Sequence, residues 1–135
     1  MAKKSNPTIL ETLAEPANVA RMVGAASIVF GVVDSLFGPR FGKVIGAKGA
    51  GGPMFQAVGA REIATGVAAI AAPTHPAPLW ARFAGDLVDL AAIGAVVAKK
   101  DNPKRLAAIA TFALVAGVAV GDFLAARHVQ KAAAA

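Results

Sequence analysis

Charged side chains inside long apolar segments are the residues of this sequence best placed to do chemistry. The segment Leu79–Ala98 is apolar throughout except for one arginine and two aspartates. A charge in hydrocarbon must face protein, water or another charge, so such residues mark an internal ionic network or a path for ions or protons. The predicted polar network comprises Arg61, Glu62, Arg82, Asp86, Asp89 and Asp122, and Asp34 is a further charge of this kind.

Spacing along a helix predicts which of these charges pair. Arg82 and Asp86 are four residues apart, so they lie on one helix face and can pair within the helix; Asp89 shares that face. Arg61 and Glu62 are adjacent and point about 100° apart, which predicts partners on other helices for each of them. Two interpretations remain open. The network either fixes helix pairing and register, which we favour for so small a protein, or lines a path for ions or protons.

The composition is that of a membrane protein. Of the 135 residues, 56% are hydrophobic and 16% are charged, whereas soluble domains are about 45–50% apolar and about 25% charged. Four apolar segments are each long enough to cross a bilayer. A water-soluble helix bundle would need a polar stripe along each helix, and residues 107–120 contain none. The predicted spans are residues 19–37, 54–72, 79–98 and 106–126.

These spans predict an all-α fold, an integral membrane four-helix bundle with antiparallel neighbours, forming a single domain over residues 1–135. Gly38-Pro39 is expected to end the first span, and a flexible, glycine-rich basic loop should follow from Arg40 to Pro53. That loop lacks the spacing and the preceding strand of a phosphate-binding loop.

A short surface helix is expected over Ile9–Glu15, ending before Pro16. The basic residues Lys3 and Lys4 resemble the start of a signal peptide, but no apolar region follows them directly, so cleavage is not expected. The first span would then act as its own insertion signal.

Small residues predict where helices approach closely. Gly24 and Gly31 lie in the first span with other small residues between them, and Gly117 and Gly121 have Gly-x-x-x-Gly spacing in the fourth. Such faces let a second helix backbone come near. We therefore expect the first and fourth spans to provide the main helix contacts, including those with partner proteins.

Several function classes are not indicated. The net charge is +6, but the basic residues flank the apolar segments, and no aromatic–basic interleaving suggests nucleic-acid binding. There are no cysteines, and the two histidines, His75 and His128, are too few for a metal or haem site. No histidine base accompanies a serine or threonine at membrane depth. No cofactor and no metal are therefore predicted, and the residues favour a non-enzymatic role without deciding it.

Two stretches carry a family resemblance. They are Gly59-Ala60-Arg61-Glu62-x-x-x-Gly66 and Trp80-Ala81-Arg82-x-x-Gly85-Asp86-x-x-Asp89-Leu90, to which Gly121-Asp122 can be added. With these motifs the chain resembles small bacterial four-helix membrane proteins of DoxX-like size, and is similar to the membrane region of some cyclase/dehydrase proteins. The resemblance covers roughly Val19 to Arg127. It implies a multi-pass protein of the bacterial inner membrane and no particular activity.

The function expected from the sequence is that of a structural or accessory subunit in a membrane complex or homo-oligomer. Its partners would be membrane lipid and other membrane subunits or further copies of the chain. The alternative is a small carrier, channel or lipid/quinone-binding protein that uses the acidic residues of the predicted network.

Overall fold

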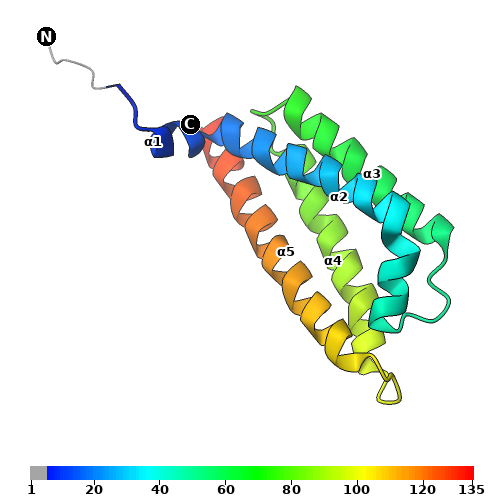
Figure 1. Ribbon diagram of the computed structural model, residues 1–135. Coiled ribbons are helices and arrows are strands. Elements are labelled where there is room, and N and C mark those ends of the chain that lie inside the picture. Colours follow the sequence, from blue (N-terminus) through cyan, green and yellow to red (C-terminus); the bar gives the residue numbers. More distant parts are fainter. Residues whose placement is uncertain (1–5) are drawn as a thin grey trace, which may run out of the picture.

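Four long helices and one short helix account for most of the chain (Figure 1). A computed structural model describes residues 6–135, so Lys3 and Lys4, considered above as part of a signal peptide, lie outside the described residues. No strand occurs among residues 6–135, and the all-α prediction is confirmed. The helices are α1 Ile9–Leu13, α2 Pro16–Ile45, α3 Gly52–Ala71, α4 Ala77–Ala98 and α5 Arg105–Ala133.

The four long helices form an antiparallel arrangement in which each packs against two others. Helix α2 packs most extensively on α3, and α4 packs most extensively on α5; contacts of α2 with α5 and of α3 with α4 complete the ring. The C-terminus, helix α1 and the turn between α3 and α4 lie at one end, and the other two connections lie at the opposite end (Figure 1). Short connections force this up-and-down order.

Proline and local hydrogen bonds start the helices. Pro16, Pro53 and Pro78 occupy the first or second position of α2, α3 and α4, where the missing N–H group costs nothing. Helix α1 begins with a capping box: Thr8 Oγ1 accepts from the N–H of Glu11, and the Glu11 carboxylate accepts from the N–H of Thr8 at 2.7 Å. That bond from the Thr8 backbone lowers the pKa of Glu11.

Helix α2 differs from its predicted extent. Gly38-Pro39 does not end it, because the helix continues through Pro39 to Ile45 and bends in its last third instead (Figure 1). A proline inside a helix removes one backbone hydrogen bond and bends the axis without necessarily stopping it. The helix ends where Gly46 adopts a left-handed conformation, with φ of 73°. The predicted loop from Arg40 to Pro53 therefore shrinks to residues 46–51.

Glycine and serine line the contact between α2 and α3. A Cβ atom placed on Gly31 would lie 2.5 Å from the carbonyl oxygen of Gly59, and one on Gly24 would lie 2.7 Å from that of Gly66. The two backbones are thus nearly in contact at both levels, so no larger residue fits without separating the helices. We call Gly24, Ser27, Gly31, Gly59 and Gly66 the glycine seam; all five residues are buried.

The interior is small and polar, and the exterior is large and apolar. Among residues 6–135 the largest side chains that are fully buried are Leu79, Val129 and Ser27. By contrast, many large apolar side chains are exposed, including Val29, Phe30, Val32, Leu36 and Phe37 of α2, and Leu106, Ile109, Phe112, Leu114, Val120 and Leu124 of α5. Soluble monomers rarely expose continuous apolar surface on this scale.

Two of the four predicted spans meet the length and composition of a membrane-crossing helix within the described residues. They are α2 and α5, and only 22% and 17% of their most apolar stretches are buried. Helices α3 and α4 do not meet that length and composition; α3 contains Arg61 and Glu62, and α4 contains Arg82, Asp86 and Asp89. Helix α5 also extends beyond residue 126, where the fourth span was expected to end, to Ala133.

Candidate functional site

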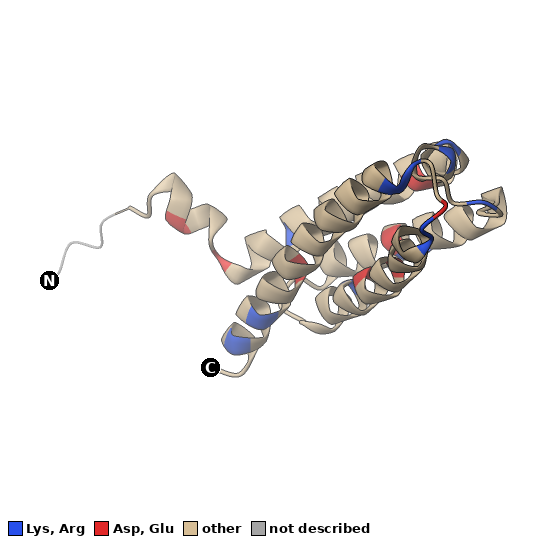
Figure 2. Cartoon of the chain, turned by 90° about the horizontal axis from the view of Figure 1, so that it is seen from below, with Lys and Arg blue, Asp and Glu red and all other residues tan. Residues whose placement is uncertain are grey.

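An ionic network joins all four long helices. In its fully buried half, Arg82 of α4 lies between two carboxylates: its Nη2 atom is 2.7 Å from Asp122 Oδ2 of α5, and its Nη1 atom contacts Glu62 Oε2 of α3. Arg82 Nε donates a further bond to Asp122 Oδ2 at 2.9 Å. This guanidinium ties α3, α4 and α5 together. Most basic residues lie instead toward the ends of the helices (Figure 2).

Helix α2 enters the network through Ser27. Its Oγ atom lies 2.6 Å from the carbonyl oxygen of Glu62 and 3.0 Å from Glu62 Oε2, and it also accepts from Arg82 Nη1. The close approach at the glycine seam is what brings so short a side chain within reach of α3 and α4.

The second half of the network is partly exposed. Arg61 Nη2 of α3 lies 2.6 Å from Asp89 Oδ2 of α4 and 3.0 Å from Glu62 Oε1. Arg61 Nη1 donates to Asp89 Oδ1 and to the carbonyl oxygen of Gly85, both at 3.3 Å. The guanidinium fits because residue 85 has no side chain: a Cβ there would lie 2.7 Å from Arg61 Cζ.

The structure brings all six predicted network residues together but changes two of the predicted pairings. Arg61 and Glu62 do pair, because the long arginine side chain curls back to its neighbour although the two Cβ directions diverge. Arg82 forms no ion pair with Asp86 in the part of the chain described. It reaches across to Glu62 and Asp122 instead, and arginine preceding aspartate is the less favourable order for a pair within one helix.

Carboxylates outnumber guanidinium groups at this site. Glu62, Asp89 and Asp122 pair with the two arginines, whereas Asp86 is only 4% exposed and makes no ion pair with any residue from 6 to 135. Within the same residues, its Oδ2 atom and Arg61 Nε are buried and without a hydrogen-bond partner. Four carboxyl groups thus stand beside two guanidinium groups.

Three of the carboxylates are close enough to share one bound cation. One oxygen atom from each of Glu62, Asp86 and Asp89 lies within 4.8 Å of the other two. Asp34, partly buried on α2, lies near enough to Glu62 and Asp89 to be repelled by them. A set of carboxylate oxygens suits hard cations such as Ca²⁺, Mg²⁺ or Mn²⁺, although no ligand spacing in the sequence predicts a metal site.

The four predicted contact glycines fall on opposite sides of the bundle. Gly24 and Gly31 lie in the glycine seam, so that surface is occupied within the chain. Gly117 and Gly121 are exposed on α5, and a Cβ added to either would meet nothing within 4 Å among the described residues. The outer α5 face around these two glycines is therefore not covered by another helix of the described chain.

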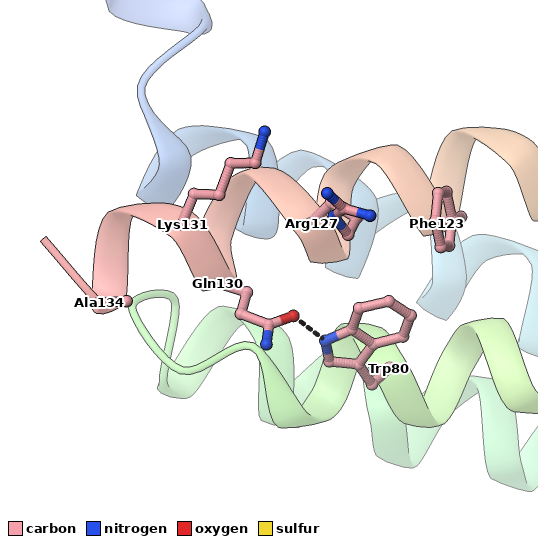
Figure 3. A pocket seen from close by; sticks show the side chains of 6 residues that line it. All are labelled: Trp80, Phe123, Arg127, Gln130, Lys131 and Ala134. Atoms are coloured by element: carbon pink, nitrogen blue, oxygen red, sulfur yellow. Dashed lines mark hydrogen bonds between the residues drawn. The ribbon is translucent and has the colours of Figure 1, made fainter.

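A pocket of about 490 Å³ lies between the start of α4 and the end of α5, next to the C-terminus (Figure 3). Trp80 Nε1 donates to Gln130 Oε1 at 3.0 Å across it. Trp80 and Phe123 stack edge to face with centroids 5.7 Å apart, and the Arg127 guanidinium lies 5.7 Å from the Phe123 ring. Lys131 follows one turn after Arg127. Aromatic rings beside cations are typical of a membrane–water interface.

Three residues of the site or its support were not identified from the sequence: Ser27, Gly85 and Asn102. Ser27 is one of the small residues between Gly24 and Gly31, and Gly85 is part of a motif. In the structure Ser27 accepts a hydrogen bond from Arg82, and Gly85 leaves room for the Arg61 guanidinium. Asn102 lies between the third and fourth predicted spans; its Nδ2 atom donates to the carbonyl oxygen of Ile45 at 2.9 Å and so caps the end of α2. Glycine at position 85, directly before Asp86, was the available signal.

No protein-family model matches this chain, and comparison with curated proteins and with solved structures likewise gives no match. The functional argument therefore depends on the geometry of the bundle itself.

Proposed function

We propose that the chain is an integral membrane four-helix bundle that serves as a structural or accessory subunit of a membrane complex or homo-oligomer. The observation that carries the proposal is the reversed distribution of side chains: glycine, alanine and an ion network inside, large apolar side chains outside. Lipid removes the cost of exposing leucine and phenylalanine, and close packing of small residues then holds the helices together. The resemblance to small bacterial four-helix proteins belongs to the same proposal, as does a place in the bacterial inner membrane.

The membrane proposal requires α3 and α4 to cross lipid despite their charges. A single charge at the bilayer centre costs about 2.5–3.5 kcal/mol on insertion scales. Here Arg61, Glu62, Arg82 and Asp89 turn toward one another between the helices, so most of that cost is offset by ion pairs and hydrogen bonds. The aromatic and basic residues of the Trp80 pocket would then sit at the interface, where Arg127 and Lys131 can meet lipid headgroups.

The accessory role is supported by the outer α5 face. Gly117 and Gly121 contact no other helix of the described chain, and they lie on a helix whose most apolar stretch is largely exposed. Small residues on an outer membrane face permit close approach of another helix. We expect that helix to come from a partner subunit or a second copy.

Purification tests this role. The tagged protein, expressed at native level and extracted in mild detergent, should bring down a stoichiometric partner or a second copy. The double variant Gly117→Leu/Gly121→Leu should lose that partner and keep its helical content. Ala92→Leu, on an exposed face of α4, is the matched control and should retain it. A wild-type protein that purifies as a lone monomer would rule out the accessory role.

A second candidate function is a small carrier or channel, or a lipid- or quinone-binding protein. The observation that favours it is the unpaired Asp86 carboxylate near the middle of α4, beside a partly exposed Arg61–Asp89 pair. In proteoliposomes, ion or proton flux that disappears in Glu62→Gln or Asp89→Asn would support this function. Flux that is unaffected by both substitutions would exclude this site as its origin.

A further inference from the structure

We propose that Glu62, Asp86 and Asp89 form a binding site for one divalent cation between α3 and α4. Each residue presents a carboxylate oxygen within 4.8 Å of the other two. Oxygen atoms that all lie 2.3–2.6 Å from one Ca²⁺ ion cannot be farther apart than about 5 Å, so the observed separation is compatible with a shared ion. This inference goes beyond the accessory role and does not depend on it.

The unpaired oxygen of Asp86 is the second observation that points to a ligand. Asp86 is 4% exposed, and its Oδ2 atom has no hydrogen-bond donor within residues 6–135. A buried polar group without a partner is costly, and native structures satisfy nearly all of them with protein, water or an ion. Glu62 and Asp89 already accept bonds from arginine, but a carboxylate oxygen has a second lone pair free for a cation.

The charge balance indicates a divalent ion. Glu62, Asp86, Asp89 and Asp122 carry four negative charges against the two positive charges of Arg61 and Arg82. With all four carboxyl groups ionised, one divalent cation removes that excess, whereas a bridging water molecule would satisfy hydrogen bonds and leave the charge unchanged. Asp34 of α2, near Glu62 and Asp89, adds negative charge on the same side. Carboxylate ligands without nitrogen or sulfur favour Ca²⁺, Mg²⁺ or Mn²⁺ over softer metals.

One side of the site is less covered by the chain than the other. The side chains of Arg61 and Asp89 are 28% and 25% exposed, whereas those of Arg82, Glu62 and Asp122 are nearly inaccessible. A hydrated ion brings further oxygen ligands with it as bound water, since three carboxylates supply fewer than the six to eight oxygens that Ca²⁺ takes.

Titration with Mn²⁺ tests the proposal directly. The full chain in detergent micelles, at constant pH and ionic strength, should bind one Mn²⁺ per chain by electron paramagnetic resonance, and Ca²⁺ or Mg²⁺ should compete. Loss of an outer-shell partner alone weakens metal binding by roughly 10–100-fold. Asp86→Asn removes a direct ligand, so it should weaken Mn²⁺ binding by at least that much. Asp101→Asn, in the exposed α4–α5 connection, is the control and should bind as the wild type does.

Thermal unfolding separates ion binding from a purely structural role. Ca²⁺ should raise the Tm of the wild type relative to EDTA, because a ligand of the folded state stabilises it. In Asp86→Asn the Tm should be the same in both conditions, and in EDTA it should be higher than that of the wild type, since an uncompensated charge is gone. Absence of stoichiometric Mn²⁺ binding, or equal binding by Asp86→Asn, would overturn the site. Neither result bears on the partner test described above.

Discussion

Gly24 and Gly31 of α2 and Gly117 and Gly121 of α5 are all predicted helix-contact glycines, but the two pairs have opposite surroundings. In the glycine seam, Gly31 lies against the backbone of Gly59, so that an added Cβ would come within 2.5 Å of a carbonyl oxygen. On α5, Gly117 and Gly121 face outward, with open space around both within the described chain. Small residues at helical spacing thus mark faces where a helix could approach, without telling whether that helix belongs to the same chain.

The position of each glycine relative to the nearest network residue accounts for the difference. At 3.6 residues per turn, Gly59 and Gly66 lie about 60° and 40° around α3 from Glu62. On α5, Gly121 and Gly117 lie about 100° and 140° from Asp122. The charged residues must face the interior, so glycines on the same side as the charge are enclosed by the chain, and those well away from it are left outside.

The largest effect is expected where the buried half of the network is broken. Arg82→Gln removes the guanidinium that pairs with Glu62 and Asp122; Asp122 then remains buried without a cation, and Glu62 keeps only its contact with Arg61. Removing one partner of a buried ion pair costs about 3–5 kcal/mol. Circular dichroism during chemical unfolding in micelles measures the loss, and the exposed Arg127→Gln is the control. A loss no greater than that of the control would show that the network does not hold the bundle.

Substitution in the glycine seam should have the next largest effect. Gly31→Ala places a methyl group against the carbonyl oxygen of Gly59 and against Ile63, at 2.5 and 2.7 Å. The obstacle is backbone, which cannot move aside as a flexible side chain could, so α2 and α3 must separate. Overpacking of this kind costs about 1–3 kcal/mol. The same unfolding assay measures it, and unchanged stability would mean that the two helices are not in backbone contact.

Much of the fold could be predicted from the sequence, because apolar length and proline positions determine where helices form. The end of α2 could not, since it depends on Phe55 packing against Gly38 and on Asn102 reaching the Ile45 carbonyl, both distant in sequence. The network residues could be named because charge is conspicuous in apolar segments. The predicted pairings were partly wrong because spacing along a helix shows only which residues of that helix are near one another, whereas Arg82 pairs with residues of two other helices.

The exposed half of the network should contribute less than the buried half. Asp89→Asn removes the main partner of Arg61, but both side chains are about a quarter exposed and Arg61 keeps its contact with Glu62. Because Arg61 keeps one of its two carboxylate partners, the loss should stay well below the roughly 3–5 kcal/mol expected for Arg82→Gln. The chemical unfolding is measured in EDTA, so that loss of a bound cation does not add to the loss of stability. A loss equal to that of Arg82→Gln would mean that the two halves act as one unit.

The smallest effect should have the opposite sign, and it sharpens the contrast between the two pairs of glycines. Gly117→Ala adds a methyl group where nothing lies within 4 Å in the described chain. Glycine in the middle of a helix is less stable than alanine by roughly 0.5–1 kcal/mol. The isolated Gly117→Ala protein should therefore be more stable than the wild type by about that much, whereas Gly31→Ala should be less stable than the wild type. If Gly117→Ala instead destabilises the purified protein, its face is already covered in solution, and dilution should abolish the difference.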